Sequence, residues 1–430
     1  MHTMHPLREA LHNEVHARPH ERLQAPVAVT HIGWVGHEVS QAREHLNALL
    51  RRRHLPEAGE GANHLSVDLG GLKLRWERHT EFHTATFIKP LLEAPGSFDK
   101  VALSDVPNDW LHALPGQWLI GMHVLVLPRA GLALHDDGVP LLVRESLSDD
   151  SLVCSRVMDA QADIYTDFRL HADGFARWLV VVDGMSQRRL GRAVQRAIEI
   201  ETYRMMALLG LPAARDVGAS LASAERDLAE VAQAIRTVEQ HYEPELLRRL
   251  SEQAAKVEGL YASTHSRFAA TTAYWELVQR RIGELREQRL LGLQTLGEFM
   301  ERRLSPGMQT CAAAARRLQA LSERISRVSN LLRTRVEVAQ QRSSQALLDA
   351  MNRRQEAQLL LQSAVEGLSV AAITYYAAGL VGYLAKGLKA ANLPVSPDLA
   401  VAVAVPFIAL SVWWGVRKLH STVLASIHPH

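Results

Sequence analysis

The sequence has few cysteines, little net charge, and no apolar segment near its first residue. Only two of its 430 residues are cysteines, Cys154 and Cys311, which excludes a disulfide framework and a thiolate metal site and favours a reducing compartment. The formal net charge of +2 excludes the strongly basic field that signals nucleic-acid binding. Residues 1–20 contain no apolar core and no cleavage site, so we expect no signal peptide and a mainly cytosolic chain.

Motifs for common enzymatic chemistry are also missing. The sequence contains no P-loop, GxGxxG, HExxH, GxSxG or EF-hand loop. Ser186 is better suited to cap a helix than to act as a nucleophile. The pairs Asp136-Asp137 and Asp149-Asp150 are most simply turn residues, or alternatively weak Mg²⁺ sites. We therefore predict that the protein is not an enzyme.

Residues 1–185 predict a cytosolic mixed domain of the α+β or α/β class. Residues 38–54 carry the apolar stripe of a helix, and 105–114 predict a shorter one. Residues 64–88 alternate in polarity around Gly70-Gly71, which is typical of a hairpin. Further strands are predicted over 27–35, 118–127, 152–158, 162–170 and 175–183. We expect a substantially antiparallel sheet.

Residues 186–362 predict a helical stalk. Helices are expected over 186–209 and 217–240, followed by one long helix from Pro244 to about Leu304. Its apolar residues recur at steps of three and four, at Leu247, Leu250, Ala254, Val257, Tyr261, Thr264, Phe268, Thr271, Trp275, Val278, Ile282 and Leu285. After a break at residues 305–307 the next helix shows the same spacing, so we predict an antiparallel coiled coil. It is either a structural stalk or a lever that signals to the membrane.

Two C-terminal segments predict a transmembrane hairpin. The first span lies within 363–387, with its apolar part at 364–385, and the second is 399–416. A short outer loop, 388–398, joins them, and 417–430 form a tail. Two tryptophans at the end of the second span and two basic residues just after it are typical of the membrane interface: Trp413, Trp414, Arg417 and Lys418. With Arg353 and Arg354 before the first span, they predict a membrane protein with both termini cytosolic.

The first span has one face of small residues. They recur at steps of three and four: Gly367, Ala371, Thr374, Ala378, Val381 and Ala385. Such a face lines a pore in an oligomer, or packs helix against helix with no pore.

Two HxExH runs are candidate cation sites. If residues 72–88 form one strand, a single face carries Arg75, Glu77, His79, Glu81 and His83. That face is a cation site, a solvated face with salt bridges, or an anion or substrate site. In a helix, His12 and His16 lie one turn apart and are candidate metal ligands. A divalent cation is therefore the candidate cofactor.

Three blocks of the sequence resemble a known bacterial family. HPLREALHNEVHARP at the N-terminus, RWERHTEF at 75–82 and the segment 332–387 are similar to uncharacterised, predicted membrane-anchored proteins that share a domain of unknown function. His20 and His83 are not part of that family's pattern, which weakens the case for His83 as a ligand.

The order of segments is also similar to the layout of CorA-type divalent-cation transporters. That layout implies an oligomer, but the Gly-Met-Asn that closes the first transporter helix is absent here. Two hypotheses follow: a homo-oligomeric CorA-like cation transporter or channel, and a membrane-anchored scaffold or sensor without transport. Both imply lipid contact and copies of the chain as partners. The second adds a protein partner.

Overall fold

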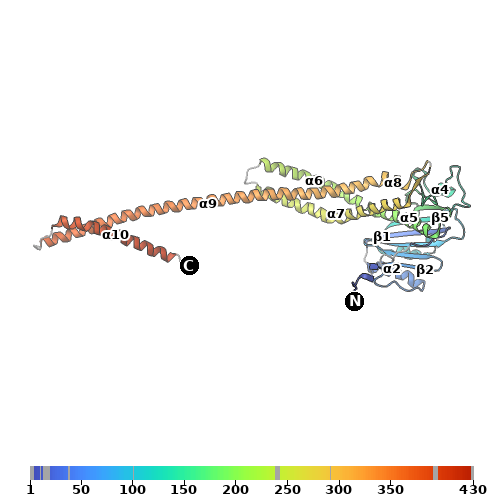
Figure 1. Ribbon diagram of the computed structural model, residues 1–430, viewed down its shortest axis with the longest axis horizontal. Coiled ribbons are helices and arrows are strands. Elements are labelled where there is room, and N and C mark those ends of the chain that lie inside the picture. The colour runs from blue at the N-terminus through green and yellow to red at the C-terminus, as the bar shows by residue number, and fades with distance from the viewer. Residues whose placement is uncertain are drawn as a thin grey trace. The chain divides into compact units, whose positions relative to one another are not determined.

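The computed structural model describes residues 4–9, 11–12, 20–36, 39–99, 101–237, 243–290, 292–390 and 396–427, without the side chains of 419–427. The chain forms two compact units. The sheet unit comprises Met1–Thr237 and Glu245–Ser329, and the C-terminal unit comprises Val238–Pro244 and Asn330–His430. Figure 1 shows the order of elements along the chain.

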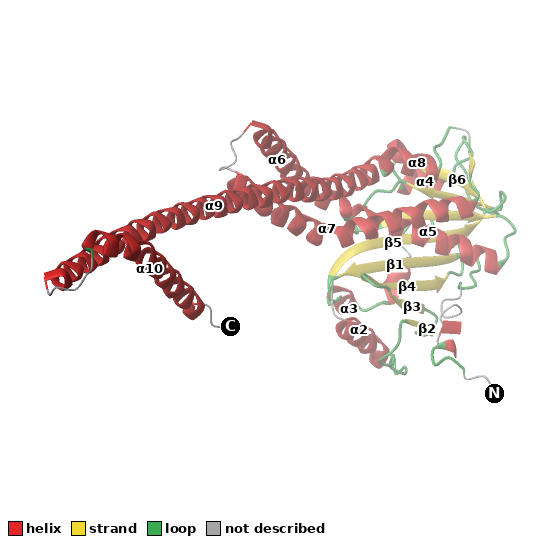
Figure 2. Ribbon diagram, turned by 60° about the vertical axis from the view of Figure 1, so that its left-hand side comes forward, coloured by secondary structure: helices red, strands yellow, loops and turns green. Residues whose placement is uncertain are grey.

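One mixed sheet forms the centre of the sheet unit (Figure 2). Its strands are β1 Val27–Val35, β2 His64–Asp68, β3 Lys73–Arg78, β4 Phe82–Pro90, β5 Gln117–Pro128, β6 Val153–Val157, β7 Ala162–Thr166, β8 Ala176–Val182 and β9 Gln288–Arg289. They lie in the order β2-β3-β4-β1-β5-β8-β7-β6-β9. Only β5 and β8 pair in parallel among these strands. The predicted α+β class with a largely antiparallel sheet is confirmed.

Helices cover both faces of this sheet, and each face has its own apolar core. On one face Leu46 of α2 (Val39–Arg52) and Trp110 of α3 (Asn108–His112) pack against Trp76. On the other, Ala197 of α5 (Gln187–Leu208) packs with Val124. Figure 2 shows α5 over the middle of the sheet. The remaining short helices are α4 Leu141–Ser146, η1 Ala102–Asp105 and η2 Asp149–Ser151.

The helical region differs from the prediction in where its helices begin and end. Helix α6 covers Gly210–Thr237 and α7 covers Glu243–Leu285, so the single helix expected to reach Leu304 is wrong. Arg286 has φ of 49° and Gly292 has φ of 82°, conformations that interrupt a right-handed helix. After β9, α8 (Leu296–Arg303) begins at a capping box formed by Thr295 and Glu298.

Helix α9 begins at Ser305 and runs to Ala390. The predicted breaker at residues 305–307 is therefore the first turn of this helix, where proline is tolerated because its missing N–H has no helical partner. The first part of α9 belongs to the sheet unit and the rest to the C-terminal unit. There it is followed by α10, Pro397–Ile427.

The close approach of α5 to the segment before β1 gives a stability prediction. A Cβ added at Gly191 would lie 1.7 Å from the Glu21 carbonyl oxygen, whereas one added at Gly218 of α6 would meet nothing within 4 Å. Gly191→Ala should therefore cost about 1–3 kcal/mol of unfolding free energy through overpacking. Gly218→Ala should be neutral or stabilising by up to about 1 kcal/mol, because alanine is the better helix former. Thermal unfolding of the detergent-solubilised chain measures both, and equal midpoints would contradict the assigned contact.

Candidate functional site

The predicted polar run at residues 75–83 is divided by a second turn. Strand β3 ends at Arg78 and β4 begins at Phe82, so residues 72–88 are not one strand and that expectation is wrong. The turn changes which residues share a face. Glu77 pairs with Thr84, whereas His83 pairs with Arg78 and lies on the opposite face.

His83 is buried in the apolar core, away from the other predicted site residues. Its ring stacks on the rings of Trp34 and Trp76, each with a centroid distance of 5.9 Å. Burial lowers the pKa of His83, and the nearby Arg78 lowers it further. A neutral ring between two indoles is a core residue, so the five predicted side chains are not brought together.

His79 and Glu81 lie in the turn between the two strands. The His79 ring stacks on Phe82 with a centroid distance of 4.1 Å. A Glu81 carboxylate oxygen accepts from Arg267 Nη2 and from the Tyr274 hydroxyl, each at 3.0 Å. These two contacts tie the turn to α7.

Arg75 and Glu77 form a buried ion pair on the face that α5 covers. Nη2 of Arg75 donates to Glu77 at 2.8 Å, and the side chains are only 5% and 8% exposed. Burial alone would raise the pKa of Glu77, but the charge and hydrogen bond of Arg75 hold it below its usual value. Both groups are therefore charged. Removing one partner of such a pair typically costs about 3–5 kcal/mol.

Helix α5 extends this ion pair into a chain of polar contacts. Nη1 of Arg75 donates to the Gln195 side-chain oxygen at 3.0 Å, and Gln195 donates to Glu199 at 3.0 Å. Glu199 in turn accepts from Arg281 of α7. Two ion pairs and one amide thus link the sheet to two helices.

His31 of β1 lies on the same face, and its tautomer follows from its partners. Thr202 uses its hydroxyl hydrogen on the Ile198 carbonyl at 2.7 Å, so it can only accept at His31 Nε2, 3.1 Å away. Nε2 therefore carries the proton, and Nδ1 accepts from the Thr86 hydroxyl at 2.8 Å. Burial lowers the pKa of His31 to about 3, which keeps the ring neutral. With both nitrogens engaged, it is neither a metal ligand nor a base.

A cavity of about 210 Å³ lies between these side chains. Its walls are strand, turn and helix residues: His20, His31, Arg75, Glu77, His79, Thr84, Gln195, Ile198, Glu199, Thr202, Tyr203 and Arg281. Two of these residues each have a buried atom without a hydrogen-bond partner in the described structure, Arg75 Nε and Thr84 Oγ1. A second cavity of about 560 Å³ shares His79 and Tyr203 with it. We call the smaller cavity the sheet–helix pocket.

Sequence reasoning found two members of this pocket's charged wall, Arg75 and Glu77, but not those from α5. A signal was present, because Gln195, Glu199 and Thr202 are polar residues at steps of four and three on one helix face. The predicted metal pair is only half described: His16 lies outside the described residues. Among the residues that the structure does describe, no cluster of three or more His, Cys, Asp or Glu is arranged to hold a metal ion.

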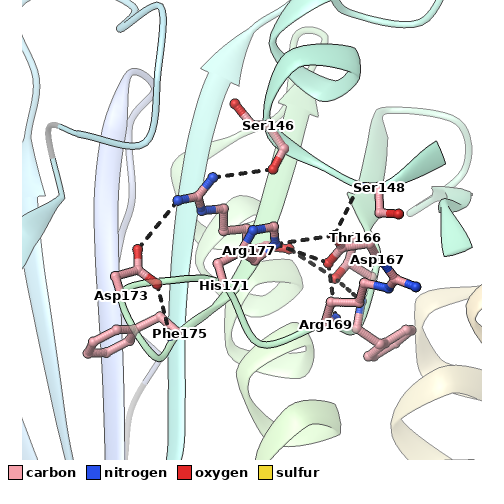
Figure 3. A network of polar contacts seen from close by, with 10 residues as sticks. Ser146, Ser148, Thr166, Asp167, Arg169, His171, Asp173, Phe175 and Arg177 are labelled. Carbon is pink, nitrogen blue, oxygen red and sulfur yellow. Dashed lines mark hydrogen bonds and ion pairs between the residues drawn. The ribbon is translucent and has the colours of Figure 1, made fainter. Parts of the chain in front are cut away.

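A second polar network, drawn in Figure 3, fixes loops of the sheet unit. The buried Asp167 carboxylate accepts from the backbone N–H groups of Ser148 and Arg169, at 3.0 and 3.1 Å, and lies 3.2 Å from His171 Nε2. Arg177 donates to the Ser146 carbonyl oxygen at 3.3 Å. These contacts join the loop before β6 to the loop after β7, so we assign the network a structural role.

The C-terminal unit contains the predicted membrane segments. Helix α9 and residues Pro397–Lys418 of α10 each hold a stretch long and apolar enough to cross a membrane, with mean hydropathies of 1.5 and 2.1. Within this unit 6% of the first stretch and none of the second is buried. The coarse prediction of two membrane-type helices is confirmed.

The small-residue face of α9 is covered along part of its length. Gly367 and Ala371 are exposed, whereas Thr374, Ala378 and Val381 are half-buried and Ala385 is buried. Helix α10 lies beside this part, since a Cβ added at Gly382 would lie 3.3 Å from Val401. The Thr374 hydroxyl donates to the Val370 carbonyl oxygen at 2.7 Å, which satisfies it within its own helix.

The chain thus combines an α+β sheet unit that contains a buried polar pocket with two membrane-type helices. It belongs to the family described as "Protein of unknown function (DUF3422)", whose model matches residues 3–423. The predicted resemblance to an uncharacterised family is confirmed. No curated protein and no solved structure matched the chain. The resemblance to CorA-type transporters stays a prediction, because none of these comparisons supports it.

The buried state of His31 predicts how stability depends on pH. Its folded pKa of about 3 is below the ordinary histidine pKa of 6.5, so the unfolded chain binds more protons between these values. Stability from this group is present above pH 6.5 and is lost as the pH falls towards 3, by up to about 1.4 kcal/mol per pH unit. His31→Gln should be less stable at pH 7.5 but should show a shallower loss between pH 6 and 4. Denaturant unfolding at each pH tests this, and identical slopes would show that His31 is not buried neutral.

Proposed function

We propose that this chain is an integral protein of the bacterial inner membrane that works as a scaffold or sensor with its sheet unit in the cytosol. The exposure of its two apolar segments supports this most directly. Each is long enough to cross the roughly 30 Å hydrocarbon core of a bilayer. Apolar surface on this scale is favourable in lipid, whereas in water it promotes association.

The flanking residues support both termini in the cytosol. Arg353 and Arg354 precede the first span, and Arg417 and Lys418 follow the second. Arg417 lies 4.9 Å from the Trp413 ring centroid, and Lys418 lies 5.0 Å from that of Trp414. Such pairs of a cation and an indole suit the interface, where one end is apolar and the other is wet.

The covered part of the small-residue face favours an anchor over a pore. Near Gly382 this face lies against Val401 of α10 in the same chain, so that part of it is not free to line a channel. Gly367 and Ala371 stay exposed and are available for close packing with another copy. A homo-oligomer held through these residues is part of the proposal. A CorA-like cation transporter is the second candidate.

The long helices are proposed to pair as an antiparallel coiled coil. In the sheet unit, Phe268 of α7 packs with Cys311 and Ala314 of α9. One groove joins Tyr261 to Leu318, so residue numbers fall along α7 as they rise along α9. The regular apolar spacing of α7 supports coiled-coil packing, and a protein partner is proposed for this surface.

Membrane insertion is tested by alkaline carbonate extraction of membranes from cells that express the full chain. The wild-type chain should stay in the pellet until detergent is added. The double variant Ile373→Arg/Phe407→Arg places a charge near the middle of each span, at about 2.5–3.5 kcal/mol each, and should lose insertion. Leu92→Arg, on a fully exposed leucine of the sheet unit, is the matched control and should behave as wild type. Release of the wild-type chain by carbonate alone would refute the proposal.

Orientation and transport need separate measurements. A membrane-impermeant maleimide added to spheroplasts should label Leu388→Cys, at the outer loop, and should not label Arg354→Cys. The reverse pattern would place the termini outside. Purified protein in liposomes should be ion-tight if it is a scaffold. Cation flux into these liposomes, seen with the wild-type chain and equally with the control variant Leu92→Arg, would favour the transporter instead.

A further inference from the structure

We propose that the sheet–helix pocket binds a small molecule with an oxyanion group, a carboxylate or a phosphate. The groups that would receive it are Arg75 Nε–H and the Thr84 hydroxyl. This site lies wholly within the sheet unit and does not depend on the proposed membrane anchoring.

The first observation is an unpartnered donor on a buried cation. The Arg75 residue is 4% exposed, and its two terminal nitrogens are engaged by Glu77 and Gln195. Its Nε has no partner among the described residues, and Arg75 is one of the residues that line the pocket. An arginine N–H can only donate, so the missing partner is an acceptor. Leaving a buried donor unpaired costs free energy, and an acceptor that entered the pocket would remove that cost.

The second observation is a contrast between two threonines of β4. Thr84 and Thr86 lie on the same face of the strand and are both buried. The Thr86 hydroxyl bonds to His31 at 2.8 Å. The Thr84 hydroxyl has no partner in the described structure, and Thr84 is one of the residues that line the pocket. Of these two threonines, only the one that lines the pocket has an unpartnered hydroxyl.

Charge and size narrow the ligand. The glutamates on the wall are each paired with an arginine, Glu77 with Arg75 and Glu199 with Arg281, so neither presents an uncompensated negative charge. A volume of about 210 Å³ is below the roughly 300–1,000 Å³ of sites for drug-sized ligands. A small organic acid or inorganic phosphate fits, and a nucleotide does not.

The test is ligand-dependent thermal unfolding of the full chain in detergent. Inorganic phosphate and acetate are titrated separately, with chloride at matched ionic strength as the reference. At least one of the two probes should raise the unfolding midpoint in a saturable way, because a ligand that binds only the folded state stabilises it. The probe that does so identifies the phosphate or the carboxylate as the recognised group.

Variants of the two threonines decide whether the effect arises in the pocket. Thr84→Val keeps the shape and removes the unpartnered hydroxyl, so it should fold normally and weaken the probe's apparent affinity at least tenfold. Thr84→Ser should retain the response. Thr86→Val should lower the midpoint without changing the probe's affinity, because it loses the bond to His31.

Three results would overturn the proposal. One is the absence of a saturable shift with either probe. Another is an equal shift in wild type and Thr84→Val, which would place the anion elsewhere. The third is a loss of stability in Thr84→Val, without any probe, as large as that in Thr86→Val, because the hydroxyl would then already be satisfied by bound water.

Discussion

The ion pair between Arg75 and Glu77 is the constraint around which one side of the sheet unit is arranged. Two charges buried to this extent are stable only when they are paired and hydrogen-bonded. The other terminal nitrogen of Arg75 donates to Gln195, and this contact fixes where α5 lies on the sheet. Glu199 and Arg281 carry the same contact chain to α7. These polar side chains line the sheet–helix pocket between the sheet and the two helices.

The histidines on the two faces of this sheet have different surroundings. The turn between β3 and β4 determines that His83 of β4 lies on the face opposite to Glu77 and Thr84. His83 lies among indole rings on one face, whereas His31 is held by two threonines on the other. Both have lowered pKa values because burial disfavours the charged ring. Neither has a metal-binding role in this arrangement, so the histidine content of the chain is not itself evidence of a metal site.

Much of the fold was predictable because most elements carry a local pattern. Strand β1 begins and ends where its apolar run predicts, and the turn at Gly70-Gly71 separates β2 from β3. The end of α7 was missed, since its apolar spacing continues past Leu285 into residues that belong to α8. Periodicity identifies a buried face but does not show that the backbone leaves the helix between two buried segments.

The sequence alone determined the α+β class, the long helices and the two membrane-type segments, because length, periodicity and hydropathy are properties of neighbouring residues. It also determined the match to the family. Only the tertiary structure decided which residues form the pocket. Arg75, Gln195 and Arg281 come from three elements and meet because the sheet and two helices pack together. Whether Thr84 has a partner depends on that packing, and no local pattern records it.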